Sequence, residues 1–313
     1  NNVSIVLLGT INANVAGQTI VVKPQGSGSL TNNGSINVTT GTLGLLPDTT
    51  GTLTNTGTIS IQGGSFSLSG TNLVNTGTTT VDPGATLTLT GNLTLASLGT
   101  FSRGAGSSIS LAGTLALGGG TLNIGSAGPF GTGGLTSLTG TIANGTLIST
   151  DATPVLNSPS GTLDGITIGS NLGFTGSTTY IYNNLLLANG VTVDKGSNGW
   201  YFRSGGTQNL ATVSGAATIN NAGGGMYAGW SVAGQTLRHF RGASNRTCLD
   251  AKLQPIAGQR VRLSAAHDHH EVQAQVITPG RRLVLDVVNV GDAGPVGVLA
   301  PVTQGQDLRA APR

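Results

Sequence analysis

The sequence predicts an all-β protein, a right-handed parallel β-helix (β-solenoid) with rungs of about 20–23 residues, followed by a compositionally distinct C-terminal tail. Three observations predict this fold class: a pattern written three times, apolar residues spaced two apart inside each copy, and glycine turns between the copies. The copies are Leu30-x-Asn32-x-Gly34-x-Ile36-x-Val38, Leu53-x-Asn55-x-Gly57-x-Ile59-x-Ile61 and Leu73-x-Asn75-x-Gly77-x-Thr79-x-Val81.

Apolar residues two positions apart leave an extended backbone on the same side, and the polar residues between them can face water. One such coil cannot bury its apolar edge alone, so successive coils must stack. Stacking predicts ladders of equivalent residues, with hydrogen bonds along the asparagine ladder. The ladders are Leu30/Leu53/Leu73, Val38/Ile61/Val81, Leu45/Leu68/Leu89 and Asn32/Asn55/Asn75. We expect Gly34, Gly57 and Gly77 to supply the positive φ that the bend beside each asparagine needs.

The other segments fit the same architecture in chain order. Residues 3–29 are expected to form the first coil, residues 30–91 the regular array, and residues 91–125 a less regular continuation. Residues 126–160 are expected to form a loop that protrudes from the coil, because prolines break strands there. Residues 161–236 are expected to form further coils. The prolines of the expected loop are Pro129, Pro154 and Pro159.

Composition divides the chain after residue 236. Residues 1–236 contain four basic and five acidic side chains, whereas residues 237–313 contain the other ten basic and six acidic ones, all four histidines and Cys248. The body is therefore near −1 and the tail near +4, so the basic pI belongs to the tail and nucleic-acid binding is not expected. We expect the tail to be poorly ordered or a small β cap, with short strands at 259–264 and 282–290.

The tail shares neither composition nor period with the body, as His239-Phe240-Arg241 and Arg281-Arg282 illustrate. Two hypotheses explain the change: an unrelated cap, or a frame-shifted translation of further coils. The encoding DNA decides between them. A coil pattern that continues in no other reading frame past codon 236 would count against the frameshift.

Several short segments resemble a known series of β-strand repeats. They are Gly99-Thr100-Phe101-Ser102-Arg103, Gly113-Thr114-Leu115, Gly140-Thr141-Ile142-Ala143-Asn144-Gly145-Thr146-Leu147, Ser160-Gly161-Thr162-Leu163-Asp164-Gly165-Ile166-Thr167-Ile168 and Gly206-Thr207-Gln208-Asn209-Leu210. They are similar to segments of large bacterial surface proteins, of the autotransporter-passenger and filamentous-haemagglutinin-like kind. The resemblance covers residues 28–237. It implies an exported stalk, extracellular or on the bacterial cell surface and often adhesive, and it transfers no site residue.

The carboxylates of the body are not spaced as a catalytic pair. The aspartates are 34, 69, 13 and 30 residues apart along the chain, and none of these spacings is close to one coil. A general acid and a general base must flank one bond, so no catalytic residue is expected. A Ser-His-Asp triad is excluded from the body because it contains no histidine. The aspartates are Asp48, Asp82, Asp151, Asp164 and Asp194.

One cluster in the tail has metal-ligand chemistry, His267-Asp268-His269-His270-Glu271. His267 and His269 would share one side of a strand, but a stable site needs further donors and support, and nothing nearby is spaced to supply them. Cys248 has no paired cysteine or histidine and is expected to be inert. We therefore expect no metal site and no cofactor.

Most aromatic residues of the body lie between residues 161 and 236, and two interpretations are open. The aromatic rings either widen the core or line an exposed groove for sugars. With the loop at 126–160, such a groove would make a carbohydrate-binding or polysaccharide-cleaving solenoid that acts through Asp151 or Asp164. The residues of the groove would be Tyr180, Tyr182, Trp200, Tyr201 and Phe202.

Threonines at alternate positions suggest a more remote alternative. Flat ranks of outward threonine can order water, as in ice-binding proteins, although β-branched threonine also suits any solvent-facing strand. The threonines are Thr52, Thr54, Thr56, Thr58, Thr78, Thr80, Thr86, Thr88 and Thr90.

The sequence favours a non-enzymatic structural or adhesive segment of a large secreted or cell-surface bacterial repeat protein. Its expected partners are a host-surface or matrix carbohydrate or protein, and a continuation of the same solenoid beyond either end. No membrane insertion is expected, because no apolar run approaches the ~18 residues that span a bilayer. The chain opens at Asn1 without a basic, signal-like segment, so we interpret it as a mature or truncated piece.

Overall fold

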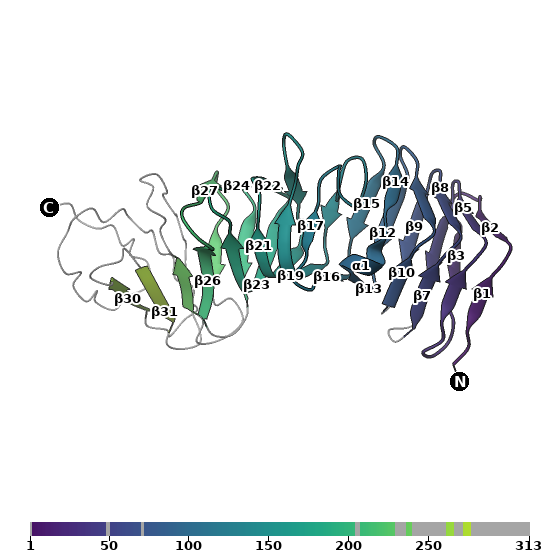
Figure 1. The fold of residues 1–313 in the computed structure, drawn as a ribbon, viewed down its shortest axis with the longest axis horizontal. Helices are drawn as coiled ribbons and strands as arrows, with labels where there is room; N and C mark the ends of the chain where they lie inside the picture. The colour runs from purple at the N-terminus through teal and green to yellow at the C-terminus, as the bar shows by residue number, and fades with distance from the viewer. Residues whose placement is uncertain are drawn as a thin grey trace.

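The computed structural model describes residues 2–47, 51–69, 72–203, 207–228, 236–239, 261–265 and 272–276. Its strands stack in parallel into a β-solenoid of about 10 turns, with almost no helix. Figure 1 shows the coils side by side along the long axis of the molecule, with the N-terminus at one end. The predicted fold class, a parallel β-solenoid, is confirmed.

Three narrow sheets enclose the first part of the solenoid, and each of the first four coils contributes one strand to each sheet. The first sheet contains β1 (Ile5–Leu7), β4 (Leu30–Asn32), β7 (Thr52–Asn55) and β10 (Asn72–Asn75). The second contains β2 (Thr10–Ala13), β5 (Ser35–Val38), β8 (Thr58–Ile61), β11 (Thr78–Val81) and β14 (Phe101–Arg103). The third contains β3 (Thr19–Val22), β6 (Thr42–Leu45), β9 (Ser65–Leu68), β12 (Thr86–Leu89), β15 (Ser108–Leu111) and β18 (Ser137–Leu138).

Two wider sheets form the second part. The path of the larger one contains β13 (Asn92–Thr94), β16 (Thr114–Ala116), β19 (Thr141–Ile148), β21 (Gly161–Ile168), β23 (Thr178–Leu187), β26 (Thr207–Thr212), β29 (Thr236–His239), β31 (Val272–Val276) and β30 (Val261–Ala265). Beside this path lie β17 (Thr121–Asn123), β25 (Gly199–Phe202) and β28 (Met226–Ala228). The smaller sheet contains β20 (Val155–Asn157), β22 (Leu172–Thr175), β24 (Thr192–Gly196) and β27 (Thr218–Asn221).

The predicted ladders form in the predicted register. Leu53 lies across from Leu30 and Leu73, and the other two apolar ladders pair in the same way. These side chains are buried in one continuous core that runs along the axis. Each buried side chain of this kind contributes roughly 1.5–3 kcal/mol, so the core of the stack is its main source of stability.

The asparagine ladder also forms, and it ends at a short helix. The Nδ2 atoms of Asn32 and Asn55 donate to Oδ1 of the next asparagine, each at 2.8 Å. Asn75 donates instead to the backbone oxygen of Leu98 at 3.3 Å. Leu98 belongs to α1 (Leu95–Leu98), a single turn that is capped by the Thr94 hydroxyl. The helix therefore replaces the strand that would have continued the first sheet.

The glycines beside this ladder have a different role from the one we expected. Gly34, Gly57 and Gly77 are not among the residues with positive φ. A Cβ atom at these positions would lie 2.0, 2.1 and 2.2 Å from a backbone oxygen of the preceding coil. The expectation of positive φ is wrong, because the close approach of adjacent backbones, and not a left-handed conformation, requires glycine here.

Three strands lie within the expected loop at residues 126–160, so the expectation of a loop is wrong for the second part of that range. β18, β19 and β20 lie within it, and β19 pairs with β16, β17 and β21. Pro154 and Pro159 flank β20 without interrupting it, a placement that strands tolerate. A turn-rich loop remains between β17 and β18, and its Phe130 side chain is fully buried.

The described parts of the tail differ from the parallel stack. β29 pairs in parallel with β26, whereas β31 pairs antiparallel with both β29 and β30. β30 overlaps the strand expected at 259–264. The strand expected at 282–290 lies outside the described residues.

Candidate functional site

The outer face of the larger sheet carries a column of three tyrosines, Tyr180, Tyr201 and Tyr227, which we call the tyrosine column. Its residues come from β23, β25 and β28 and lie across from one another in the parallel register. The ring centroids of Tyr180 and Tyr201 are 5.9 Å apart, and those of Tyr201 and Tyr227 are 4.5 Å apart and stacked. All three side chains are partly exposed, so the column forms an ordered aromatic surface along the solenoid axis.

Strand alternation places the aromatic residues of the expected groove on two different faces of the sheet. Trp200 and Phe202 flank Tyr201 in β25, point into the core and are fully buried. The ring of Trp200 packs edge-on against Phe174, with centroids 5.3 Å apart. Trp200 and Phe202 therefore belong to the core, as the first interpretation expected. Tyr180, Tyr182 and Tyr201 are partly exposed.

Arg203 extends the aromatic surface with a positive charge. Its guanidinium carbon lies 3.9 Å from the centroid of the Tyr180 ring, a distance at which the cation and the ring attract each other. The backbone of Arg203 is fixed because its N–H donates to the carbonyl of Ile181 at 2.9 Å. Its Nε atom is buried and has no hydrogen-bond partner among the described residues.

A polar corner borders the column. Asp164 lies across from Tyr182, and its Oδ1 accepts a hydrogen bond of 2.6 Å from the amide of Asn183. Asn144 and Asn183 have positive φ, which lets the chain bend in the middle of long strands. The sequence carried a signal for this corner, since Asn144-Gly145 and Asp164-Gly165 are turn dipeptides about one coil apart.

The other described aspartates have structural partners. Both carboxylate oxygens of Asp151 accept from the backbone N–H of Ser126, at 3.0 and 3.1 Å. Asp82 begins a turn that closes with a hydrogen bond from Ala85. Asp194 lies across from Gly173 and Asn220. Asp48 lies outside the described residues.

Arg103 fixes the loop between β17 and β18. Its Nε donates to the Ser107 hydroxyl at 3.0 Å, and its Nη2 donates to the Thr136 hydroxyl at 3.2 Å. The remaining N–H groups reach backbone oxygens of Ser107, Phe130 and Gly134. Burial lowers the pKa of Arg103, but an arginine remains charged at any physiological pH. Every nitrogen of the guanidinium group therefore donates a hydrogen bond that holds this part of the fold.

Lys195 is a second buried cation, inside the solenoid. Its side chain has no exposed surface, and Nζ donates to the backbone oxygen of Asn198. Burial lowers the pKa of Lys195 to about 8. Nearby, the amide nitrogen of Asn198 donates to the carbonyls of Ser158 and Thr175 at 3.1 and 3.2 Å. Sequence reasoning gave no sign of this internal polar cluster.

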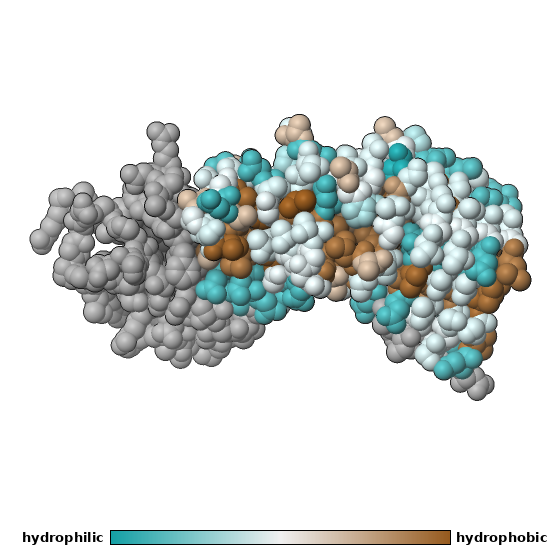
Figure 2. Space-filling view, in the orientation of Figure 1, coloured by the Kyte–Doolittle hydropathy of each residue, from teal (hydrophilic) through white to brown (hydrophobic). Residues whose placement is uncertain are grey.

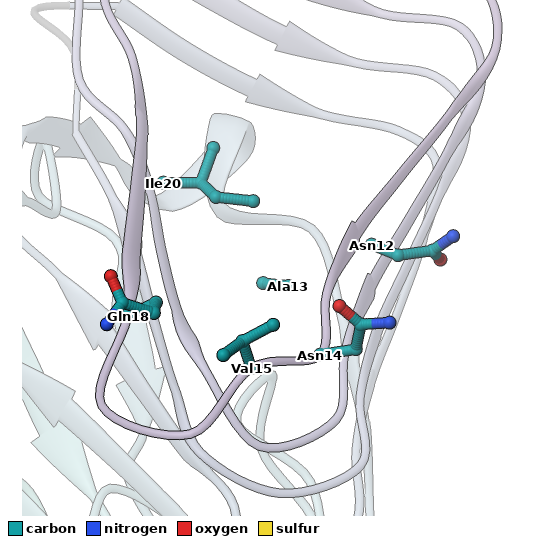
Figure 3. A pocket seen from close by; sticks show the side chains of 6 residues that line it. All are labelled: Asn12, Ala13, Asn14, Val15, Gln18 and Ile20. Carbon is teal, nitrogen blue, oxygen red and sulfur yellow. The ribbon is translucent and has the colours of Figure 1, made fainter.

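A shallow cavity of about 120 Å³ lies at the turn of the first coil (Figure 3). Its lining consists of Asn12, Ala13, Asn14, Val15, Gln18 and Ile20. No ionisable side chain lines it, so it offers no acid–base or metal chemistry. Figure 2 shows apolar surface at the same end of the molecule. The exposed apolar residues of this coil are Val3, Val6, Leu8, Val15 and Val21.

The threonines of the remote alternative do not form regular columns in this register. Thr86 and Thr88 lie across from serines in both neighbouring strands, and Thr54 lies across from Val74. This mixture gives no repeating threonine array at these positions.

His267 to Glu271 and Cys248 lie outside the described residues. Within the described ranges, no three His, Cys, Asp or Glu side chains gather where they could hold a metal, and no helix there has the length and apolar character to cross a membrane. Comparison with protein-family models, curated proteins and solved structures finds no match for this chain.

Proposed function

We propose that this chain is a non-enzymatic, adhesive segment of a secreted or cell-surface bacterial repeat protein. The observation that carries the proposal is the tyrosine column with Arg203, presented on the outside of a rigid stack. A solenoid holds such a surface at a fixed geometry because each strand is bonded to the coil above and below. The resemblance to bacterial surface repeats supports an extracellular location.

Carbohydrate is the partner class that this surface suits best. Partly exposed tyrosines offer an apolar ring and a hydroxyl in one side chain, and the polar corner at Asp164 and Asn183 supplies further hydrogen-bonding groups. Sugars present the complementary combination of apolar C–H faces and hydroxyls. The alternative, a polysaccharide-cleaving enzyme, would act through Asp164, the carboxylate that lies beside Tyr182.

The test is a binding screen of the full chain against immobilised polysaccharides and matrix proteins. Tyr201→Thr is the informative variant, because Thr162 already occupies the outward position across from Tyr180. We expect Tyr201→Thr to weaken binding by about tenfold, whereas Thr88→Ala on a distant outer strand leaves binding unchanged. Equal binding by both variants would overturn the proposed surface.

Release of reducing ends distinguishes the enzyme from the adhesin. We expect binding without turnover. Cleavage that is abolished by Asp164→Asn, with binding retained, would replace the adhesive function by the enzymatic alternative.

A further inference from the structure

The two arginines of the solenoid body, Arg103 and Arg203, make different contacts. Each N–H-bearing nitrogen of the Arg103 guanidinium donates to an oxygen of the protein. Arg203 contacts a ring face, and its guanidinium donates no hydrogen bond to the residues that the structure describes. Its Nε is buried even so. The residue as a whole is partly exposed, and its Nη1 and Nη2 groups donate to no described residue and are not buried. Polar N–H groups in proteins nearly always have an acceptor, so these two groups are the ones that can receive an acceptor from outside.

Arg203 is also isolated among the cations of residues 1–236. Arg103 is occupied by its loop, Lys195 is buried, and Lys23 belongs to the first coils at the other end of the stack. The body is slightly negative overall. Among the four cations of residues 1–236, Arg203 is therefore the one that lies beside the tyrosine column, and it is held against an aromatic ring.

We infer that Arg203 binds the carboxylate of an acidic sugar, a uronic acid, whose ring lies along the tyrosine column. This inference rests on the proposed carbohydrate-binding function and specifies its ligand. A guanidinium matches a carboxylate because two parallel N–H groups meet two oxygens. Stacking on Tyr180 removes rotamer freedom from Arg203 before binding, and this lowers the entropy lost on complex formation.

The neighbouring groups explain why a sugar acid suits the site better than a small anion. Tyr180 and Tyr182 lie on the same strand and are both partly exposed, so apolar and hydroxyl contacts are available beside the charge. Asp164 is held by Asn183 across from Tyr182, and its negative charge disfavours a ligand that carries several charges. The combination selects one carboxylate on a largely neutral ring.

The experiment measures binding of the full chain to an oligosaccharide with a single glucuronic acid residue, and to the methyl ester of that oligosaccharide, by titration calorimetry. The ester keeps the sugar rings and replaces the charged carboxylate by a neutral group. We expect the acid to bind roughly 10–100-fold more tightly than the ester, since one hydrogen bond to a charged group has this effect. Arg203→Met should remove the difference, and Arg203→Lys should restore only part of it. Lys23→Met, which also removes one positive charge, should leave it intact.

The outcomes separate the inference from the proposed function. Equal binding of acid and ester, with both weakened by Tyr201→Thr, overturns the carboxylate site and leaves carbohydrate binding in place. Binding of neither sugar, with binding to another polysaccharide or matrix protein that depends on Tyr201, overturns the uronic acid alone. If the Arg203→Met variant still binds the acid more tightly than the ester, the carboxylate is bound by another residue and the inference is wrong. Binding of dextran sulfate through Arg203, without binding of the glucuronic acid, overturns the ligand class.

Discussion

The Nδ2 atom of Asn32 donates a hydrogen bond of 2.8 Å to Oδ1 of Asn55, one coil further along the solenoid, and both side chains are fully buried. The same bond is made again from Asn55 to Asn75. Asn55 therefore uses its amide as acceptor on one side and as donor on the other. This position tolerates no side chain that has only one of these two functions.

We predict that Asn55→Ala destabilises the solenoid by about 2–4 kcal/mol, because two buried amide groups lose their partner. The matched control is Asn37→Ala. Its amide also bonds to the preceding coil, to Asn12 at 2.9 Å, but on the exposed surface. Water replaces that bond, so we expect a change within about 0.5 kcal/mol. Chemical denaturation of both variants checks the prediction, and similar midpoints would contradict it.

The glycine ladder gives a second prediction. A Cβ at position 57 would lie 2.1 Å from the carbonyl oxygen of Gly34, and backbone cannot move aside as a flexible side chain can. We expect Gly57→Ala to destabilise the protein by about 1–3 kcal/mol. Gly9 begins the same ladder but has no atom within 4 Å of its Cβ position. Gly9→Ala should therefore be neutral in thermal unfolding, and a matching loss there would contradict the close-approach explanation.

Local pattern was enough to predict the regular coils but not the contacts between distant segments. The Leu-x-Asn-x-Gly repeat fixed the register of residues 30–89, because equivalent residues must stack when one coil follows another. The loop before β18 depends on Arg103 and on the burial of Phe130, which belong to different coils. Glycine and proline signals report turns and give no information about such pairings.

Part of the candidate site could be predicted from the sequence. Alternation along β25 places Trp200 and Phe202 on one side and Tyr201 on the other. The sequence is therefore enough to separate the aromatic residues of the core from those of the outer face. Alternation also places Arg203 on the side of Tyr201, but the contact of Arg203 with Tyr180 and the position of Tyr227 beside Tyr201 could not be predicted from the sequence. Their places depend on the register between coils of unequal length, which the irregular spacing after residue 91 does not specify.

Arg103 gives a third prediction, on local stability. We expect Arg103→Met to increase amide hydrogen exchange in the loop between β17 and β18 by roughly 10–100-fold, because hydrogen bonds to a charged group are lost. Arg103→Lys should give little protection, since one ammonium cannot replace a planar fork. Arg203→Met is the control and should leave the loop unchanged. Full protection by lysine would contradict the role of the guanidinium geometry.

Lys195 predicts an unusual dependence of stability on pH. Its pKa in the folded protein is about 8, below the ordinary value of 10.5. Below pH 8 both states hold the proton, and burial of the charge destabilises the fold by about 3 kcal/mol. Between pH 8 and 10.5 the unfolded chain binds a proton that the folded chain does not, so the free energy of unfolding rises with pH. Above this window the penalty is gone.

The variant that isolates this effect is Lys195→Met, which keeps an unbranched side chain of similar length and removes its charge. The difference in free energy of unfolding between Lys195→Met and the parent should be largest near pH 7, in favour of methionine, and should shrink between pH 8 and 10.5. Subtraction removes the pH dependence that both proteins share. Denaturant unfolding across this range measures the difference. A constant difference would mean that Lys195 holds its proton in the fold, with a counter-charge that the desolvation argument leaves out.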